Sequence, residues 1–293
     1  MTATFAPERY HAFRPRRVRF DYKQTPTHWI PGDPHTTHVV NVLHLLLPAG
    51  ERWFCEVFRR ALPLIDDPTL QRDVKAFIGQ EATHARAHDA VVEHLVAGGV
   101  DPTPFTHLVE WGFNTIGVED APGWLPGPVR RWLSRTYLRW QLAIIAAIEH
   151  FTAVLGWWIV VSRGLDRAGA DPTMMQLLRW HGAEEVEHRS VAFDTYRAAG
   201  GGFLRRCAAM IGVFLGMLAV WFVATWYLMR KDPAVRRGRR ASVRRFVRAG
   251  KAGLLPTTGD LARAVPRYLA PRYHPSHECR TQVAIDLLAP TTT

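Results

Sequence analysis

Apolar residues recur at helical spacing along most of the chain, and no useful stretch alternates apolar and polar residues as a half-buried strand would. Start and stop signals bound four such segments, because Asp-Pro pairs precede the second and fourth, and runs of glycine follow both. The first is expected to begin after Pro48-Ala49-Gly50. We predict an all-α fold with helices over 51–65, 69–97, 128–163 and 172–199.

The remaining segments define the expected organisation of the chain. Residues 1–37 are rich in Pro, Arg and His and are interpreted as an irregular basic N-terminal arm. Residues 38–202 hold the four expected helices as one metal-binding bundle. An additional long apolar helix is expected over 203–231, and a basic C-terminal extension over 232–293.

The stretch Cys207–Met229 contains no charged residue, and basic residues flank it on both sides. About 20 apolar residues suffice to cross a bilayer. A single crossing would place some 200 preceding residues, which have no secretory signal, on the far side. Spanning, lying at the interface and packing on the bundle all remain open. We expect a cytoplasmic protein associated with the inner face of the membrane.

Composition and charge narrow the class of protein. Hydrophobic residues make up 47% of the 293 residues and charged residues 22%, which indicates a folded chain. The net charge of +11 is concentrated at 12–23 and 230–251, which favours an anionic membrane surface contacted through 207–251. Nucleic acid is a less suitable partner. Three widely spaced cysteines argue against disulfides and a cysteine zinc site.

The candidate chemistry lies in two Glu-x-x-His pairs about a hundred residues apart, Glu81/His84 and Glu185/His188. Two further histidines, His88 and His181, share a helix face with these pairs because residues spaced by three, four or seven lie on one side of a helix. Bringing such charges into an apolar interior costs several kcal/mol per ion unless a partner compensates. A divalent metal suits a mixed Glu and His set.

Single glutamates on the other two helices would complete a dinuclear site. Dinuclear carboxylate bundles take one Glu from each of two helices and a Glu-x-x-His from each of the others. Glu149 stands alone in the apolar run 142–161 and is the candidate on the third helix. On the first helix the choice lies between Glu51 and Glu56. On the residues alone Glu51 is the weaker candidate, because a glutamate in a first turn also stabilises the helix dipole and so needs no metal to explain it.

Neighbouring polar residues have supporting roles in this hypothesis. We expect Glu184 to be a second bridging or outer carboxylate, and Glu187 to be solvated. His150 points away from Glu149 and is expected to make an internal hydrogen bond. Asp194 is a candidate acceptor that would orient His188 or His181.

Four strings in order, PAGERWF (48–54), FIGQEATHARAH (77–88), AIEHFTA (147–153) and WHGAEEVEHRSVAFD (180–194), resemble a bacterial family called predicted metal-dependent hydrolases. The resemblance covers roughly 35–275, and its shared glutamate falls on Glu51 rather than Glu56. The candidate metal ligands are therefore Glu51, Glu81, His84, His88, Glu149, His181, Glu185 and His188, and Glu81, Glu149 and Glu185 are the candidate catalytic residues.

The ligand pattern also resembles ferritin-like di-iron carboxylate oxygenases, including amine N-oxygenases with an additional histidine ligand. Their His-x-x-x-Glu-x-x-His string matches His181, Glu185 and His188. This likeness implies a ferritin-like four-helix bundle that holds two divalent ions, with iron favoured and manganese or zinc as alternatives.

Two functions follow from such a site. We favour a di-iron, O₂-activating oxygenase or oxidase acting on a hydrophobic, lipid-like substrate, which would need an electron donor that the sequence does not identify. The alternative is a hydrolase in which two metal ions activate a bound water. Iron storage suits the basic, apolar C-terminal third poorly, and a nucleic-acid binder would leave the buried carboxylates unexplained.

Overall fold

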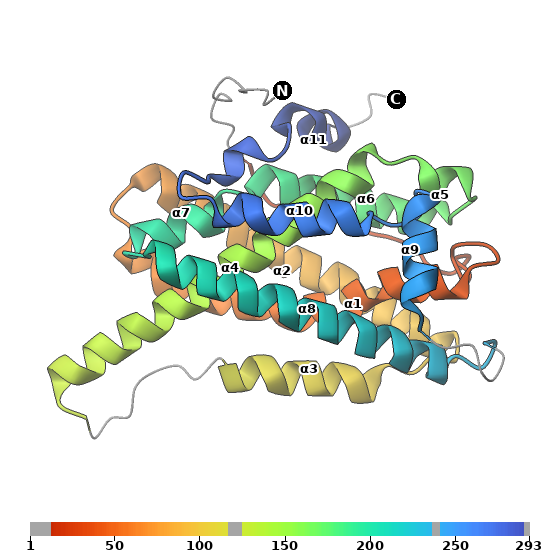
Figure 1. Ribbon diagram of the computed structural model, residues 1–293, viewed down its shortest axis with the longest axis horizontal. Helices are drawn as coiled ribbons and strands as arrows, with labels where there is room; N and C mark the ends of the chain where they lie inside the picture. The colour runs from red at the N-terminus through yellow and green to blue at the C-terminus, as the bar shows by residue number, and fades with distance from the viewer. Residues whose placement is uncertain (1–12, 117–124, 236–240, 290–293) are drawn as a thin grey trace.

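The computed structural model describes residues 13–116, 125–235 and 241–289, and these residues form helices and no strand (Figure 1). The all-α prediction is confirmed. The longer helices, in chain order, are α1 (Pro34–Ala61), α2 (Pro68–Ala97), α3 (Thr103–Ile116), α4 (Gly127–Val161), α6 (Pro172–His188), α7 (Val191–Ala198), α8 (Phe203–Lys231), α9 (Val243–Lys251), α10 (Thr258–Leu269) and α11 (Thr281–Leu288).

Helix α1 begins 17 residues earlier than expected, at Pro34 rather than Glu51. Asp33 caps it by accepting a hydrogen bond from the Thr36 backbone N–H, and Pro34 occupies the first turn, where no N–H is required. Pro48 lies inside the helix instead of before it. An interior proline costs about 3 kcal/mol, but the preceding turns bury a row of apolar side chains whose packing outweighs this cost.

The fourth expected helix is two helices, because α6 ends at His188 and α7 begins at Val191. The buried Arg189 stands at the break. Its guanidinium donates to the Val186 carbonyl oxygen at 2.6 Å and to the Pro275 carbonyl oxygen at 3.1 Å. Arg189 thus satisfies the Val186 carbonyl group near the end of α6 and ties this end to the C-terminal segment.

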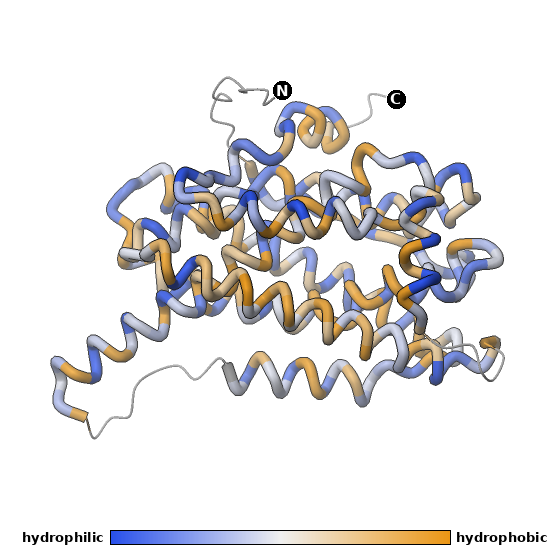
Figure 2. The backbone as a smooth tube through the Cα atoms, in the orientation of Figure 1, coloured by the Kyte–Doolittle hydropathy of each residue, from blue (hydrophilic) through white to orange (hydrophobic). Residues whose placement is uncertain are grey.

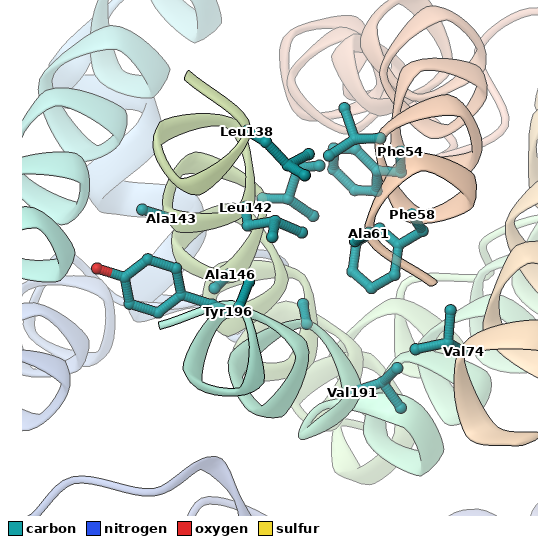
Figure 3. Packing of buried hydrophobic residues seen from close by; sticks show 14 of the residues in the cluster. Phe54, Phe58, Ala61, Val74, Leu138, Leu142, Ala143, Ala146, Val191 and Tyr196 are labelled. Atoms are coloured by element: carbon teal, nitrogen blue, oxygen red, sulfur yellow. The ribbon is translucent and has the colours of Figure 1, made fainter. Parts of the chain in front are cut away.

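Helices α1, α2, α4 and α6 enclose the polar interior, and an apolar cluster lies next to it, where Phe77 contacts the His188 ring. Figure 3 shows part of this cluster. Phe54 and Phe58 of α1 pack there with Leu138 and Leu142 of α4, and Tyr196 of α7 joins them. These side chains are nearly or completely buried. The cluster thus forms a closely packed apolar core that holds α1, α4 and α7 together.

Helix α8 lies along the outside of this assembly, where it packs on α1, α4 and α10 (Figure 1). Its colouring is apolar along most of its length, whereas α9 is strongly hydrophilic in places (Figure 2). By length and composition α4 and α8 are the two described helices that could cross a membrane. Of their most apolar windows, 61% is buried in α4 and 17% in α8.

Candidate metal centre

The predicted ligands converge from four helices on one buried volume. Glu51 comes from α1, Glu149 from α4, and the remaining residues from α2 and α6. Their side chains are buried although each carries a charge or a ring nitrogen. The helices bring together all eight predicted residues: Glu51, Glu81, His84, His88, Glu149, His181, Glu185 and His188. Their role as metal ligands stays a prediction.

The candidate donor atoms form two adjacent groups. Within each group the atoms lie within 4.8 Å of one another. The His188 Nε2 atom lies 3.3 Å from a Glu185 oxygen, which also brings the two groups next to each other. The first group is Glu51, His84, His181 and Glu185, and the second is Glu81, Glu149 and His188.

Six of these residues hold buried polar atoms that have no hydrogen bond within the described part of the chain. A buried polar atom without a partner costs about 1–3 kcal/mol, so such a concentration needs an explanation. The unpartnered atoms include both oxygens of Glu51, Glu81 and Glu149, together with Glu185 Oε2, His84 Nδ1 and His188 Nε2. Four carboxylates and two imidazoles fit a pair of divalent cations that would satisfy these atoms.

Outer polar groups orient two of the histidines. The Nε2 atom of His84 lies 2.9 Å from Glu184, and its Nδ1 is left facing Glu81 and Glu185. The Nδ1 atom of His188 lies 3.1 Å from the Gln80 side-chain oxygen, and its Nε2 is left facing the carboxylates. Holding one ring nitrogen this way fixes which nitrogen is offered to a metal.

The N-terminal segment supplies a cation to this outer layer. The Arg16 guanidinium donates to Glu184 at 2.9 Å and to Glu187 at 2.7 Å. Glu187 also accepts from the Gln80 amide at 3.1 Å. The expectation that Glu187 is solvated is therefore wrong, because a segment 171 residues earlier in the chain covers it. Sequence reasoning missed Arg16 and Gln80, which carry no local signal of this role.

A row of three histidines leads away from Glu185. The Glu185 Oε1 atom lies 2.7 Å from His181 Nε2. The His181 Nδ1 atom lies 2.6 Å from His88 Nε2. His88 Nδ1 in turn lies 2.7 Å from His44 Nδ1. His88 thus stands behind His181 and belongs to neither donor group. His44 was not among the predicted residues, because α1 was expected to start after it.

Burial controls the ionisation of these groups. Burial, and then the charges of neighbouring carboxylates, raise the pKa values of Glu51, Glu81 and Glu149 well above their ordinary range. Burial also opposes ionisation of Glu185, but His188 and His181 together hold its pKa well below the ordinary value.

The histidine pKa values move in the opposite direction. Burial, and then the charge on His181, lower the pKa of His84 to about 4 and that of His44 to about 3. His84 is therefore neutral at pH 7 and can donate a lone pair to a cation. A cation would also remove the cost of ionising the neighbouring carboxylates, which is the electrostatic condition of a metal site.

Other residues from the sequence analysis fall outside the centre. Glu56 is exposed on α1, in agreement with the choice of Glu51. His150 makes the expected internal hydrogen bonds, with Nε2 3.0 Å from the Ala264 carbonyl oxygen. Asp194 was expected to orient His188 or His181. It pairs instead with His274 at 2.9 Å, because α7 starts after a break and points it elsewhere.

A third group of donor atoms lies at the far end of α8. Asp232 accepts from His28 and His38, at 2.5 Å and 2.7 Å between Nε2 and Oδ2. Its other oxygen accepts from the Ala234 backbone N–H. Because these hydrogen bonds satisfy both Asp232 oxygens, we interpret the trio as a latch that joins the N-terminal segment, α1 and the end of α8.

A cavity of about 350 Å³ reaches the centre from the side of α8. His181 and Glu185 belong to its wall, so it ends against the first donor group. The rest of the wall is mainly apolar, with side chains from α1, α4, α8, α9 and α10 such as Val40, Phe151, Phe214, Phe246 and Leu261. Its composition suits an apolar small molecule.

Comparison with known proteins gives one match. No curated protein and no solved structure matches the chain. A family model described as a predicted metal-dependent hydrolase matches residues 14–278, which include every residue of the two donor groups and all of the cavity-forming helices. The chain therefore belongs to the predicted metal-dependent hydrolase family.

Proposed function

We propose that this protein hydrolyses a hydrophobic, lipid-like substrate with the help of two divalent metal ions. The observation that carries the proposal is the meeting of two features. A buried set of unpartnered carboxylate and imidazole atoms lies at the inner end of a mainly apolar cavity. The family supports metal-dependent hydrolysis ahead of the oxidation that we favoured from the sequence.

The six residues with unpartnered atoms would hold the ions. Glu51, His84 and Glu185 would hold one, and Glu81, Glu149 and His188 would hold the other. Zinc, manganese or iron bound there supplies Lewis acidity and lowers the pKa of water. Glu184 and Gln80 keep the two imidazoles in the required orientation.

We assign proton handling to His181. Both of its ring nitrogens already have partners, and its side chain lines the cavity. A proton held at Nε2, next to Glu185 Oε1, is placed to reach the leaving group of a substrate in the cavity. The apolar walls exclude bulk water and favour an acyl or similar chain over a charged substrate.

Oxygen activation is the second candidate function. The specific observation in its favour is the donor set of four carboxylates and two histidines, because this set is used by di-iron carboxylate proteins. It would require iron and an external electron donor. The substrate class would be the same, since the cavity is the same.

The first test is metal content followed by reaction. We expect about two metal ions per chain from the donor set, with hydrolysis of long-chain nitrophenyl esters. Glu81→Ala and Glu185→Ala should each abolish metal loading without unfolding the protein. Glu56→Ala, an exposed change on α1, is the matched control and should keep the metal.

The outcomes separate the hypotheses. Full metal retention in both alanine variants would contradict the site. Two irons per chain with an optical change on exposure to O₂, and no ester hydrolysis, would replace hydrolysis by oxidation. A metal-loaded His181→Gln variant that keeps full hydrolysis would refute the proton assignment alone.

A further inference from the structure

The outer face of α8 is a continuous apolar surface. From Ala208 to Trp226 every exposed position of this helix is Ala, Gly or a large hydrophobic residue. The large side chains on it are Ile211, Leu215, Leu218, Val220, Phe222, Val223 and Trp226. A surface of this extent on a folded protein marks a site of interaction with an apolar partner. We call it the α8 face.

Cations border the α8 face near its C-terminal end. Arg230 stacks over the ring of the exposed Trp226, with its guanidinium carbon 4.8 Å from the ring centre. Helix α9 presents Arg244, Arg248 and Lys251 to solvent. No ion pair within the described residues engages these α9 side chains. Tryptophan with adjacent arginine is typical of the boundary between lipid tails and headgroups.

The cavity opens at the same place. Its inner wall contains the buried Glu185 and His181, whereas three of its other wall residues are at least half exposed. These are Leu218 at 52%, Phe222 at 50% and Val243 at 65%. Leu218 and Phe222 belong to the α8 face, and Val243 begins the basic helix α9. The mouth therefore lies between the apolar face and the cationic helix.

We propose that the α8 face and α9 rest on an anionic membrane surface, and that the cavity takes its lipid-like ligand directly from the bilayer through this mouth. The proposed membrane contact is inferred from the α8 face and α9 alone, whereas the proposed uptake of substrate rests on the proposed function. Apolar side chains enter the headgroup region while the arginines and lysine contact anionic lipid, as in other interfacial helices.

The packing of α8 favours a helix that lies on the membrane over one that spans it. Residues near both of its ends are buried against the bundle, among them Met210 and Leu228. The Trp221 indole N–H also donates to the Val39 carbonyl oxygen of α1 at 2.8 Å. A spanning α8 would draw the attached bundle, with its buried glutamates, into hydrocarbon.

Charge argues against a second copy of the chain as the occupant. Two copies that meet with their α8 helices parallel would bring the α9 cations of both into the same region, where they repel, and an antiparallel pair would leave those cations without an anionic partner. An anionic membrane instead attracts them. It also supplies an apolar ligand at the mouth, which a second copy would cover.

The binding test is sedimentation with vesicles made of equal parts phosphatidylglycerol and phosphatidylcholine, and with phosphatidylcholine alone. We expect binding to the anionic vesicles and at least about tenfold weaker partitioning after Arg244→Glu with Arg248→Glu. Ile211→Glu with Leu215→Glu should weaken it similarly. The matched control for the arginine variant is Arg72→Glu with Lys75→Glu, and the matched control for the apolar variant is Leu64→Glu with Val96→Glu. Both controls change exposed residues elsewhere on the protein and should bind vesicles normally.

The uptake test uses a fluorescent hexadecanoate probe carried by the same anionic vesicles. After high salt has released the protein from the vesicles, the protein should still hold the probe. Leu218→Trp with Val243→Trp, which narrows the mouth, should lower this uptake at least about tenfold while vesicle binding persists. Circular dichroism and metal content report that each variant is folded.

The results that overturn the proposal are specific. Absence of binding to anionic vesicles, or equal loss in variants and controls, would refute the membrane surface. If the protein is a dimer that does not bind vesicles, and the double substitution Ile211→Glu with Leu215→Glu dissociates this dimer, the α8 face would be assigned to a second copy of the chain. Uptake that is unchanged in the narrowed variant would refute entry through this mouth.

Neither readout depends on turnover, so failure here is distinguishable from failure of the proposed function. A protein that binds vesicles and takes up the probe but hydrolyses no ester would retain the membrane surface and lose the hydrolase assignment. A protein that hydrolyses esters in solution but ignores vesicles would show the reverse.

Discussion

Helices α4 and α8 are both long and apolar enough to cross a membrane, yet they occupy opposite environments. From Leu138 onward α4 runs through the interior, and it buries Glu149 among apolar side chains. α8 has no acidic or basic residue between Arg206 and Arg230 and leaves most of this stretch exposed or partly exposed. The helix with the charge is inside, and the helix without one is outside.

The difference shows that burial follows the partners available to a helix, rather than its average hydropathy. α4 can bury a glutamate because three other helices bring histidines and further carboxylates to the same place, where a metal would satisfy them all. α8 meets the bundle with one side only, so its other side needs an apolar environment that the rest of the fold does not supply.

The largest expected effect comes from placing the same new charge on each helix. Leu142→Glu on α4 buries an unpaired carboxylate and should lower the free energy of unfolding by about 3–5 kcal/mol. Leu215→Glu on α8 is solvated and should change it by less than about 0.5 kcal/mol. Urea unfolding of both variants measures the contrast, and similar losses would contradict the assigned exposure of α8.

Removing the buried carboxyl group from α4 should act in the opposite direction. In the metal-free protein, Glu149→Leu replaces a buried carboxylate that lacks a hydrogen bond, and we expect the free energy of unfolding to rise by about 1–4 kcal/mol. The same variant should bind less metal. Thermal unfolding with and without metal checks both effects. If the metal-free variant is less stable than the metal-free parent, the interpretation that Glu149 destabilises the fold in the absence of metal is refuted.

Glycines sharpen the comparison further. A Cβ at Gly156 of α4 would lie 2.5 Å from the Gly182 carbonyl oxygen of α6, whereas a Cβ at Gly216 of α8 would meet nothing within 4 Å. Gly156→Ala should therefore destabilise the fold by about 1–3 kcal/mol and reduce metal binding by separating α4 from α6. Gly216→Ala should stabilise it by about 0.5–1 kcal/mol. Chemical denaturation of the two variants measures both changes in the free energy of unfolding, and changes of the same sign would contradict the comparison.

The smallest effect concerns the latch at the end of α8. Burial opposes ionisation of Asp232, but hydrogen bonds from His38 and His28 outweigh it and hold the Asp232 pKa below its ordinary value. The resulting stabilisation is present above the ordinary carboxyl pKa of about 3.9 and disappears as pH falls through the lower folded-state pKa. At pH 7, Asp232→Asn should lower the free energy of unfolding by about 1 kcal/mol, measured by urea unfolding. This difference should shrink below about pH 4, and a constant difference would contradict it.

Much of the helical structure could be predicted because its signals are local. The Asp-Pro starts placed α2 and the beginning of α6 within a residue or so, and the glycines placed the end of α2. The start of α1 was mispredicted because Pro48 is a strong local break signal, whereas the packing that overrides it involves residues distant in the chain. The prediction of a single helix over 172–199 was wrong at Arg189, where the helix breaks, because a hydrogen-bond partner of Arg189 belongs to the C-terminal segment.

The sequence by itself determined the all-α fold and the two Glu-x-x-His pairs, because helical period and i, i+3 spacing are properties of neighbouring residues. Only the tertiary structure decided that these pairs meet, that Arg16 reaches Glu184 from 168 residues away, and that an apolar cavity joins the centre to the α8 face. Such contacts depend on how whole helices pack. Helix packing is set by the sum of many weak side-chain contacts between distant segments, which no local pattern records.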